Sequence, residues 1–278
     1  MTAPSANFIL CCMIHEEQIR RAEATLADAE ALLAVERQSL NDSPYTPEEV
    51  RQVLSRPEHR AYLAWRGGEP VGFCSCFETP TEEGPRLEID LLGVVPAHRG
   101  RGLGTRLIQY SIAQALCEGI RFFRAVVAVD NGASQGAFRR AGFLPEPHPR
   151  VMFIYEVRGL TPRDFLPPGW RWQAHDQGPR QVHSLHAEQG ELLASAECLE
   201  VHTCAYSGLW LERVWTCSPQ AEQYLARALV EQAKALDLDE VDYLAPSAIE
   251  EGEAALPWLR EGYQRVTPLY TVWLARCP

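Results

Sequence analysis

The sequence predicts an α/β protein in which two α+β domains with mixed sheets follow one another, the second being truncated. Three observations support this. The chain has 278 residues, which suits about two domains. Strand and helix patterns alternate through one full set in residues 1–160. The later part of that set returns in residues 161–278, at an interval of about 120 residues that corresponds to a domain and not to a short repeat.

The first half opens with two helices whose N-termini are marked by capping residues. Thr25 precedes a helical pattern with Asp28 three positions on. Thr46 is followed by Pro47 at the first helical position and by Glu49 at the third. The elements expected in this half are strands over 19–22, 61–65, 71–77, 87–95, 122–129 and 151–157, and helices over 26–40, 47–55, 104–117 and 131–141.

The second half begins after a Pro-rich stretch, 161–169, and repeats features of the first. Residues 182–199 have the strand–turn–strand layout of 61–77, and residues 258–263 echo 138–143. A helix is expected over 219–236, with strands over 209–215, 240–244 and 269–275. The last of these should close the second half as the strand over 151–157 closes the first. Three tryptophans are expected in its core, namely Trp210, Trp215 and Trp258.

The charge of the chain argues against some partners. The 26 basic and 37 acidic side chains give a net charge of −11, which disfavours nucleic acid, because proteins bind it largely through basic residues. Residues 1–160 hold 17 basic and 20 acidic side chains, against 9 and 17 in residues 161–278. The acidic excess therefore lies in the second half. A small anionic ligand at a local site remains compatible with this balance.

The N-terminal region carries no membrane or export signal. Its apolar run, Phe8 to Ile14, is shorter than the roughly 20 residues that a membrane span needs, and no basic residue precedes it. We therefore expect a cytoplasmic protein without a membrane partner, and Met13 is a candidate start. His183 and His186 are three apart on a predicted strand and face opposite sides, so no metal site is expected.

The most informative segment runs from Leu92 to Thr105, where a strand leads into a glycine-rich turn and the turn into a helix. Backbone N–H groups in such a turn converge on an anion, and the helix dipole adds to the attraction. Glycines allow phosphate oxygens to approach the backbone, and the arginines add positive charge. A plain tight turn is the alternative. The residues concerned are Leu92, Gly93, Val94, Arg99, Gly100, Arg101, Gly102, Leu103, Gly104 and Thr105.

The pattern Arg99-x-x-Gly102-x-Gly104 resembles the acyl-CoA motif of the GNAT N-acetyltransferase superfamily. Asn131, eleven residues before Gly142, is similar to the second motif of that superfamily, and the order of elements over residues 17–158 is also similar. The resemblance implies acetyl-CoA or another acyl-CoA as co-substrate. It implies that the backbone from 92 to 94 pairs with the pantetheine arm, that amides from 99 to 105 hold the pyrophosphate, and that Asn131 contacts the pantetheine or the reacting centre.

Two carboxylates precede the glycine-rich turn. Glu88 and Asp90 are two apart on a predicted strand, so both side chains should face one cleft. Acyl transfer to an amine needs a base, and a carboxylate serves directly or through water. Glu88 lies eleven residues before Arg99, where GNAT members that use a glutamate base often place it, so Glu88 is the first candidate and Asp90 the second. A solvated or ion-paired carboxylate is the alternative.

The sequence departs from the superfamily pattern at Phe138. Members often carry a tyrosine there as general acid to the leaving thiolate, and phenylalanine has no proton to donate. Phe138 is grouped with the cofactor-binding residues by its position in the motif. The second half has no glycine over 216–224, so it is expected to lack a phosphate loop, to be structural and to help form a wall of the acceptor site.

The sequence thus predicts an N-acetyltransferase that moves an acetyl group from acetyl-CoA to a primary amine of an unidentified small molecule or peptide. A non-catalytic acyl-CoA sensor is the alternative, favoured by Phe138 and the degenerate second half. A nucleotide-binding protein is the third hypothesis, and the missing G-K-[ST] pattern weighs against it.

Overall fold

The computed structural model describes residues 17–40, 44–163, 166–177, 180–246 and 255–277. The segment from Phe8 to Ile14 and the candidate start at Met13 lie outside the described residues. Among the residues described, no helix is both long and apolar enough to cross a membrane.

The first half contains the expected elements, and its two N-terminal helices are capped as the sequence predicts. The Thr25 side chain accepts a hydrogen bond from the amide of Asp28, and Thr46 and Glu49 form a capping box. The elements are β1 (Gln18–Arg21), α2 (Leu26–Ser39), α3 (Pro47–Leu54), β2 (His59–Arg66), β3 (Glu69–Thr81), β4 (Gly84–Val94), α4 (Leu103–Cys117), β5 (Phe122–Ala128), α5 (Gly132–Arg140), β6 (Leu144–Pro145) and β7 (Arg150–Glu156).

The second half repeats this order in shortened form. Its elements are β8 (Arg171–Gln177), β9 (Arg180–His186), β10 (Leu192–His202), β11 (Ser207–Thr216), α6 (Pro219–Ala235), β12 (Glu240–Pro246), α7 (Leu256–Arg260) and β13 (Gln264–Arg276). The sequence analysis missed β8. Trp258 is fully buried in the core, as predicted, whereas Trp215 is 49% exposed, so the prediction for Trp215 was wrong. Its neighbours Val214 and Thr216 are half-buried on the alternate face of the strand.

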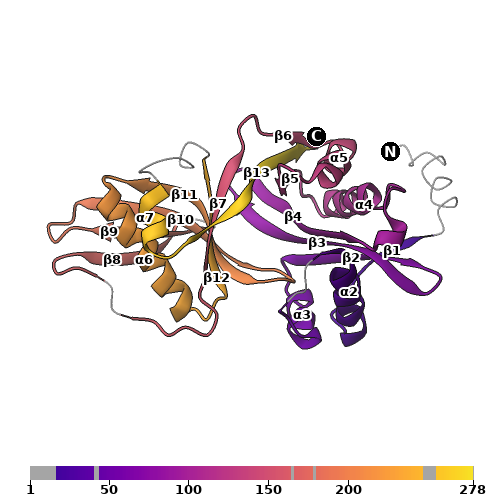
Figure 1. The fold of residues 1–278 in the computed structure, drawn as a ribbon, viewed down its shortest axis with the longest axis horizontal. Coiled ribbons are helices and arrows are strands. Elements are labelled where there is room, and N and C mark those ends of the chain that lie inside the picture. Colours follow the sequence, from indigo (N-terminus) through magenta and orange to yellow (C-terminus); the bar gives the residue numbers. More distant parts are fainter. Residues whose placement is uncertain (1–16, 41–43, 164–165, 178–179, 247–254, 278) are drawn as a thin grey trace.

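In the described residues the strands join into one sheet, in the order β1-β2-β3-β4-β5-β13-β7-β12-β11-β10-β9-β8. Figure 1 shows α2 and α3 on one face of the first half and α4 and α5 on the other. Each face has its own apolar cluster, since alternate residues of a strand point to opposite sides: Leu63 and Phe73 pack with α2, and Tyr62 and Cys74 pack with α4. Helices α6 and α7 cover the sheet of the second half.

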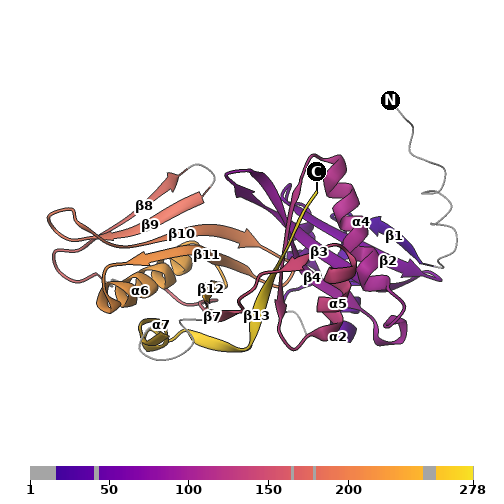
Figure 2. The ribbon, with the colours of Figure 1, turned by 90° about the horizontal axis from the view of Figure 1, so that it is seen from above.

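The two halves exchange their closing strands, which corrects the expectation that each half closes itself. Strand β7 pairs along its whole length with β12 of the second half. The end of β13, from Tyr270 to Arg276, pairs with β5 of the first half. Figures 1 and 2 both show β13 crossing from the second half to the first. The sequence pattern did not reveal this, because both strands are apolar and either fits the open edge of either sheet.

Each half has a bulge at the same place, and the bulge precedes a gap in the sheet. Ile89 and Leu91 pair with consecutive residues of β3, which leaves Asp90 as the extra residue. In the second half, Glu212 is the extra residue between β10 and β11. The described ladder of β4 with β5 ends at the pair Ile89–Ala125. Beyond that pair, no strand in the described part of the chain pairs with the edge of β4 that faces β5.

Candidate active site

The glycine-rich turn forms a concave surface at the N-terminus of α4. Gly100 and Gly102 have φ angles of +74° and +78°, the left-handed region that favours glycine. Gly102 is the N-cap of α4, and no side chain caps this helix. The amides of its first turn therefore have no side-chain acceptor, as an anion site requires. A cavity of about 670 Å³ lies here, lined by Ser39, Leu40, Leu92, Val94, His98, Arg99, Gly100, Gly102, Leu103, Gly104, Thr105, Asn131, Ala133, Ser134, Ala137 and Arg140.

Arg99 and Gly93 hold the glycine-rich turn and strand β4 against the end of α2. The Arg99 guanidinium donates to the backbone carbonyls of Val94 and Ser39, both at 2.9 Å, and so ties the turn to β4 and to the end of α2. A Cβ at Gly93 would lie 2.4 Å from Phe73 and from Ser39, so this glycine serves close packing between the strand and α2. Arg101 is exposed on the turn.

The two motif residues on α5 differ in their surroundings. Asn131 lines the cavity, and its Oδ1 accepts a hydrogen bond of 3.1 Å from the amide of Ser134, so the side chain is the N-cap of α5. Phe138 is 4% exposed and packs edge-on against Phe143, with ring centroids 5.1 Å apart. Among the described residues, Phe138 belongs to the apolar core and lines neither this cavity nor the one described below.

The corresponding helix of the second half offers no comparable surface. Helix α6 starts directly after β11, and the Ser218 side chain caps it by accepting from the amide of Ala221. A side chain thus occupies the place that is open at Gly102. The second half lacks the glycine turn, as its sequence indicates.

A smaller cavity of about 270 Å³ lies between the halves, where β4 and β5 part. Glu88 and Asp90 both line it, which confirms that they face one cleft. Its far wall belongs to the second half. The lining residues are Phe77, Thr79, Glu88, Ile89, Asp90, Arg124, Ala125, Val126, Met152, Ile154, Val201, Tyr206, Trp210, Glu240, Asp242 and Tyr270.

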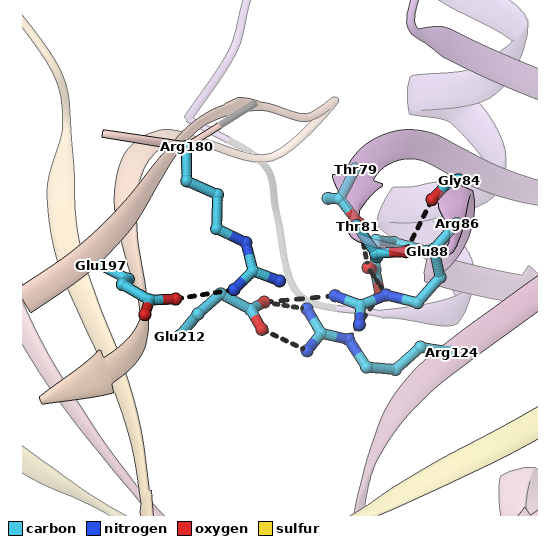
Figure 3. A network of polar contacts seen from close by, with 9 residues as sticks. All are labelled: Thr79, Thr81, Gly84, Arg86, Glu88, Arg124, Arg180, Glu197 and Glu212. Carbon is cyan, nitrogen blue, oxygen red and sulfur yellow. Dashed lines mark hydrogen bonds and ion pairs between the residues drawn. The ribbon is translucent and has the colours of Figure 1, made fainter. Parts of the chain in front are cut away.

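The Glu88 carboxylate is held by three donors (Figure 3). Thr79 donates to Oε1 at 2.5 Å, Arg86 to Oε1 at 2.6 Å and Arg124 to Oε2 at 2.7 Å. Both arginines also pair with Glu212, the bulge residue of the second half. Burial alone would lower the pKa of Arg124, but Glu88 and Glu212 outweigh it and raise the pKa. Glu88 is therefore an ion-paired carboxylate, the alternative that the sequence left open.

Asp90 has a different environment. Its Oδ2 is buried and has no hydrogen-bond partner in the described part of the chain. Burial, followed by the negative charges of Glu88 and Glu240, raises the pKa of Asp90 to about 7. A carboxylate with a pKa near neutrality is suited to proton transfer at physiological pH.

Two cavity residues from the second half, Glu240 and Asp242, were not singled out from the sequence. Trp210 was expected in the core, but it lines the cavity, and the guanidinium of Arg124 lies 5.9 Å from its ring centre. The internal duplication is the sequence signal that could have identified these residues, because equivalent strand positions in the two halves correspond. Glu88 pairs with Arg124 between β4 and β5, as Trp210 pairs with Asp242 between β11 and β12. In the described residues, no group of three or more His, Cys, Asp or Glu side chains is placed to hold a metal ion.

Part of this chain is similar in sequence to a protein family and to several known proteins. The pattern of the Acetyltransferase (GNAT) family matches residues 27–143. The L-2,4-diaminobutyric acid acetyltransferase of Shouchella clausii is 41% identical over 78 residues, which are 28% of this chain and 43% of that protein. The N-alpha-acetyltransferase RimI of Mycobacterium tuberculosis is 29% identical over 128 residues, 46% of this chain and 79% of that protein. The chain thus spans less than half the length of the first of these relatives.

Solved structures match nearly the whole chain. A tandem GNAT protein from the clavulanic acid biosynthesis pathway superposes with a TM-score of 0.54 at 12% identity, over 95% of this chain and 99% of that one. A GCN5-related N-acetyltransferase from Sphaerobacter thermophilus gives 0.60 at 14% identity, over 93% and 95%. The fold is therefore that of a tandem GNAT protein. Residues 27–143 carry the sequence pattern of the Acetyltransferase (GNAT) family.

Proposed function

We propose that the protein is an N-acetyltransferase that moves an acetyl group from acetyl-CoA to a primary amine of a small acceptor. One observation carries this proposal: β4 lines both cavities. Leu92 and Val94 border the cavity at the glycine turn, and Glu88 and Asp90 border the smaller cavity between the halves, which we call the carboxylate cavity. A donor bound along the open edge of β4 would thus place its thioester where an amine enters from the other side. The named relatives support acetyl transfer as the reaction.

The donor site proposed here uses backbone groups more than side chains. The pyrophosphate would accept hydrogen bonds from amides between Arg99 and Thr105, at the uncapped N-terminus of α4. The pantetheine arm would pair with the free edge of β4 at residues 92–94 as an added strand does. Gly104 faces the side chains of Leu92 and Val94, so its missing Cβ leaves room beside that arm. Asn131 borders the same cavity.

Asp90 is the proposed base, in place of Glu88. An incoming ammonium gives one proton to the Asp90 carboxylate, and the freed nitrogen attacks the thioester carbonyl. Backbone amides near residues 92–94 would stabilise the oxyanion that forms. When the carbon–sulfur bond breaks, the nitrogen gives its second proton to solvent, and the thiolate takes up a proton from solvent because Phe138 has none to give. Asp90 then releases its own proton to solvent before the next turnover. Glu88 keeps Arg86 and Arg124 in position.

A non-catalytic acyl-CoA sensor is the second candidate, and the burial of Phe138 in the core favours it. Both functions need the same donor site, and they differ in turnover. A thiol-release assay with acetyl-CoA and a panel of small amines separates them. The transferase predicts release that depends on the amine, with a product heavier by one acetyl group. Binding of acetyl-CoA without release for any amine would establish the sensor instead.

The net charge of the chain and the nature of the donor support two further parts of the proposal. The net charge of −11 favours an acceptor that is a cation or a small neutral molecule over nucleic acid. We infer a cytoplasmic location, since acetyl-CoA is a cytoplasmic metabolite.

A further inference from the structure

The carboxylate cavity is bordered by more carboxyl groups than its own arginines pair with. Glu88 and Glu212 are matched by Arg86 and Arg124 in one network of ion pairs. The other three carboxylates that border the cavity are Asp90, Glu240 and Asp242, and none of them forms an ion pair with a described residue. Two of these three come from β12 of the second half.

Asp242 is the most deeply buried member of this group. Its side chain is 2% exposed, and its Oδ2 has no hydrogen-bond partner among the described residues. Burial, followed by the charge of Glu240 and by a side-chain hydrogen bond between the two carboxyl groups, holds the pKa of Asp242 well above its usual range, so the pair retains a proton. Two buried carboxyl groups that share a proton have no cation to balance a second negative charge, and an ammonium group that enters from the cavity can take the place of that proton.

The rest of the lining suits a cation of limited size. Tyr206, Trp210 and Tyr270 border the cavity, and aromatic faces attract cations. Its volume of about 270 Å³ corresponds to roughly nine water molecules at about 30 Å³ each. That is below the range of about 300–1,000 Å³ for drug-sized ligands. The cavity therefore fits a short aliphatic amine.

We propose that the acceptor is a small diamine, with one amino group facing Asp90 and the second ammonium bound by Asp242 and Glu240. This inference rests on the proposed function and names its substrate class. It gives the second half a direct role: Asp242 and Glu240 are specificity-determining residues that the first half lacks. In the first half, Arg124 occupies the position that corresponds to Asp242.

Calorimetry of the full chain with free coenzyme A tests this without turnover. Putrescine is compared with n-pentylamine, in which a methyl group replaces the second amino group. Putrescine should bind at least about tenfold more tightly, because charge-assisted hydrogen bonds are the stronger kind. The substitution Asp242→Asn should remove that preference, and Glu240→Gln should weaken it. Asp237→Asn, at an exposed residue outside the cavity, is the matched control and should change neither affinity.

The outcomes distinguish this inference from the proposed function. Equal binding of the two amines, absence of putrescine binding, or a putrescine preference that survives in both Asp242→Asn and Glu240→Gln would overturn the diamine assignment. Coenzyme A would still bind in those cases, and the transferase would stand. If coenzyme A itself does not bind, the proposed function fails. Thermal unfolding of each variant shows whether it is folded, and Glu240→Gln serves if Asp242→Asn is not.

Discussion

Glu88 and Asp90 are two positions apart on β4, but their carboxylates have different surroundings. Glu88 accepts hydrogen bonds from one hydroxyl and two guanidinium groups, whereas Asp90 has a buried oxygen without a partner. Sequence spacing placed both in one cleft, and it ranked Glu88 first by its distance from Arg99. The proposed reversal of this ranking depends on Arg124 and Glu212, which lie far away in the chain, so no local pattern would have indicated it.

The role of Asp90 is tested by Asp90→Asn, which keeps the size of the side chain and removes its basicity. The maximal rate of acetyl transfer should fall by about 10²–10⁴-fold, the usual contribution of a positioned acid–base group. The affinity for acetyl-CoA should stay the same, because its proposed contacts lie beyond Leu92. The reference variant is Glu88→Gln, which weakens the ion pairs of this residue. It should lower the thermal unfolding midpoint and reduce the maximal rate much less than Asp90→Asn does. Full activity of Asp90→Asn would exclude Asp90 as the base.

The raised pKa of Asp90 gives a pH dependence with a definite sign. Burial, then Glu88, Glu240 and Glu36, raise the pKa to about 7, and a hydrogen bond with Thr203 lowers it less. The base must be deprotonated, so kcat/KM should rise with pH through about 7 and level off above it. This rise should vanish in Asp90→Asn. A profile of the wild type that is flat between about pH 6 and 8 would contradict a base with this pKa.

At the scale of elements, the sequence predicted most helices and strands because their signals are local. The caps at Thr25 and Thr46 and the turn at Gly102 each follow from a few neighbouring residues. The partners of β7 and β13 were mispredicted, because strand pairing depends on contacts that are distant in the sequence. An apolar pattern shows that a strand is buried and leaves its neighbours undetermined.

The exchanged strand is tested by two adjacent residues of β13. Trp273 is 1% exposed and belongs to the apolar cluster of the first half, whereas Leu274 is 41% exposed. Trp273→Ala should lower the free energy of unfolding by about 3–5 kcal/mol, and Leu274→Ala should change it little. Hydrogen exchange should show the loss of protection in β5, which pairs with β13. Faster exchange confined to β12, the counterpart of β5 in the second half, would mean that β13 closes its own half.

At the scale of the whole molecule, the duplication has given its two copies different tasks. The first half has an uncapped helix behind a glycine turn, and the second has the same helix closed by Ser218. The second half contributes Trp210, Glu240 and Asp242 to the cavity between them. The sequence predicted the loss of the second phosphate loop. It did not identify these wall residues, since each is an ordinary strand residue until the two sheets are joined.

The central claim is one acyl-CoA site per chain, at the glycine turn of the first half. Calorimetric titration with acetyl-CoA tests it most directly. The wild type is compared with two variants that carry a valine at the second position of α4 or of the corresponding helix α6. Gly104→Val fills the space beside Leu92 and Val94 without requiring a positive φ and should weaken binding at least about tenfold, or about 1.4 kcal/mol. Gln220→Val, exposed on α6, should leave binding unchanged. The account predicts a stoichiometry of one for the wild type; two equivalent sites, or full affinity in folded Gly104→Val protein, would contradict it.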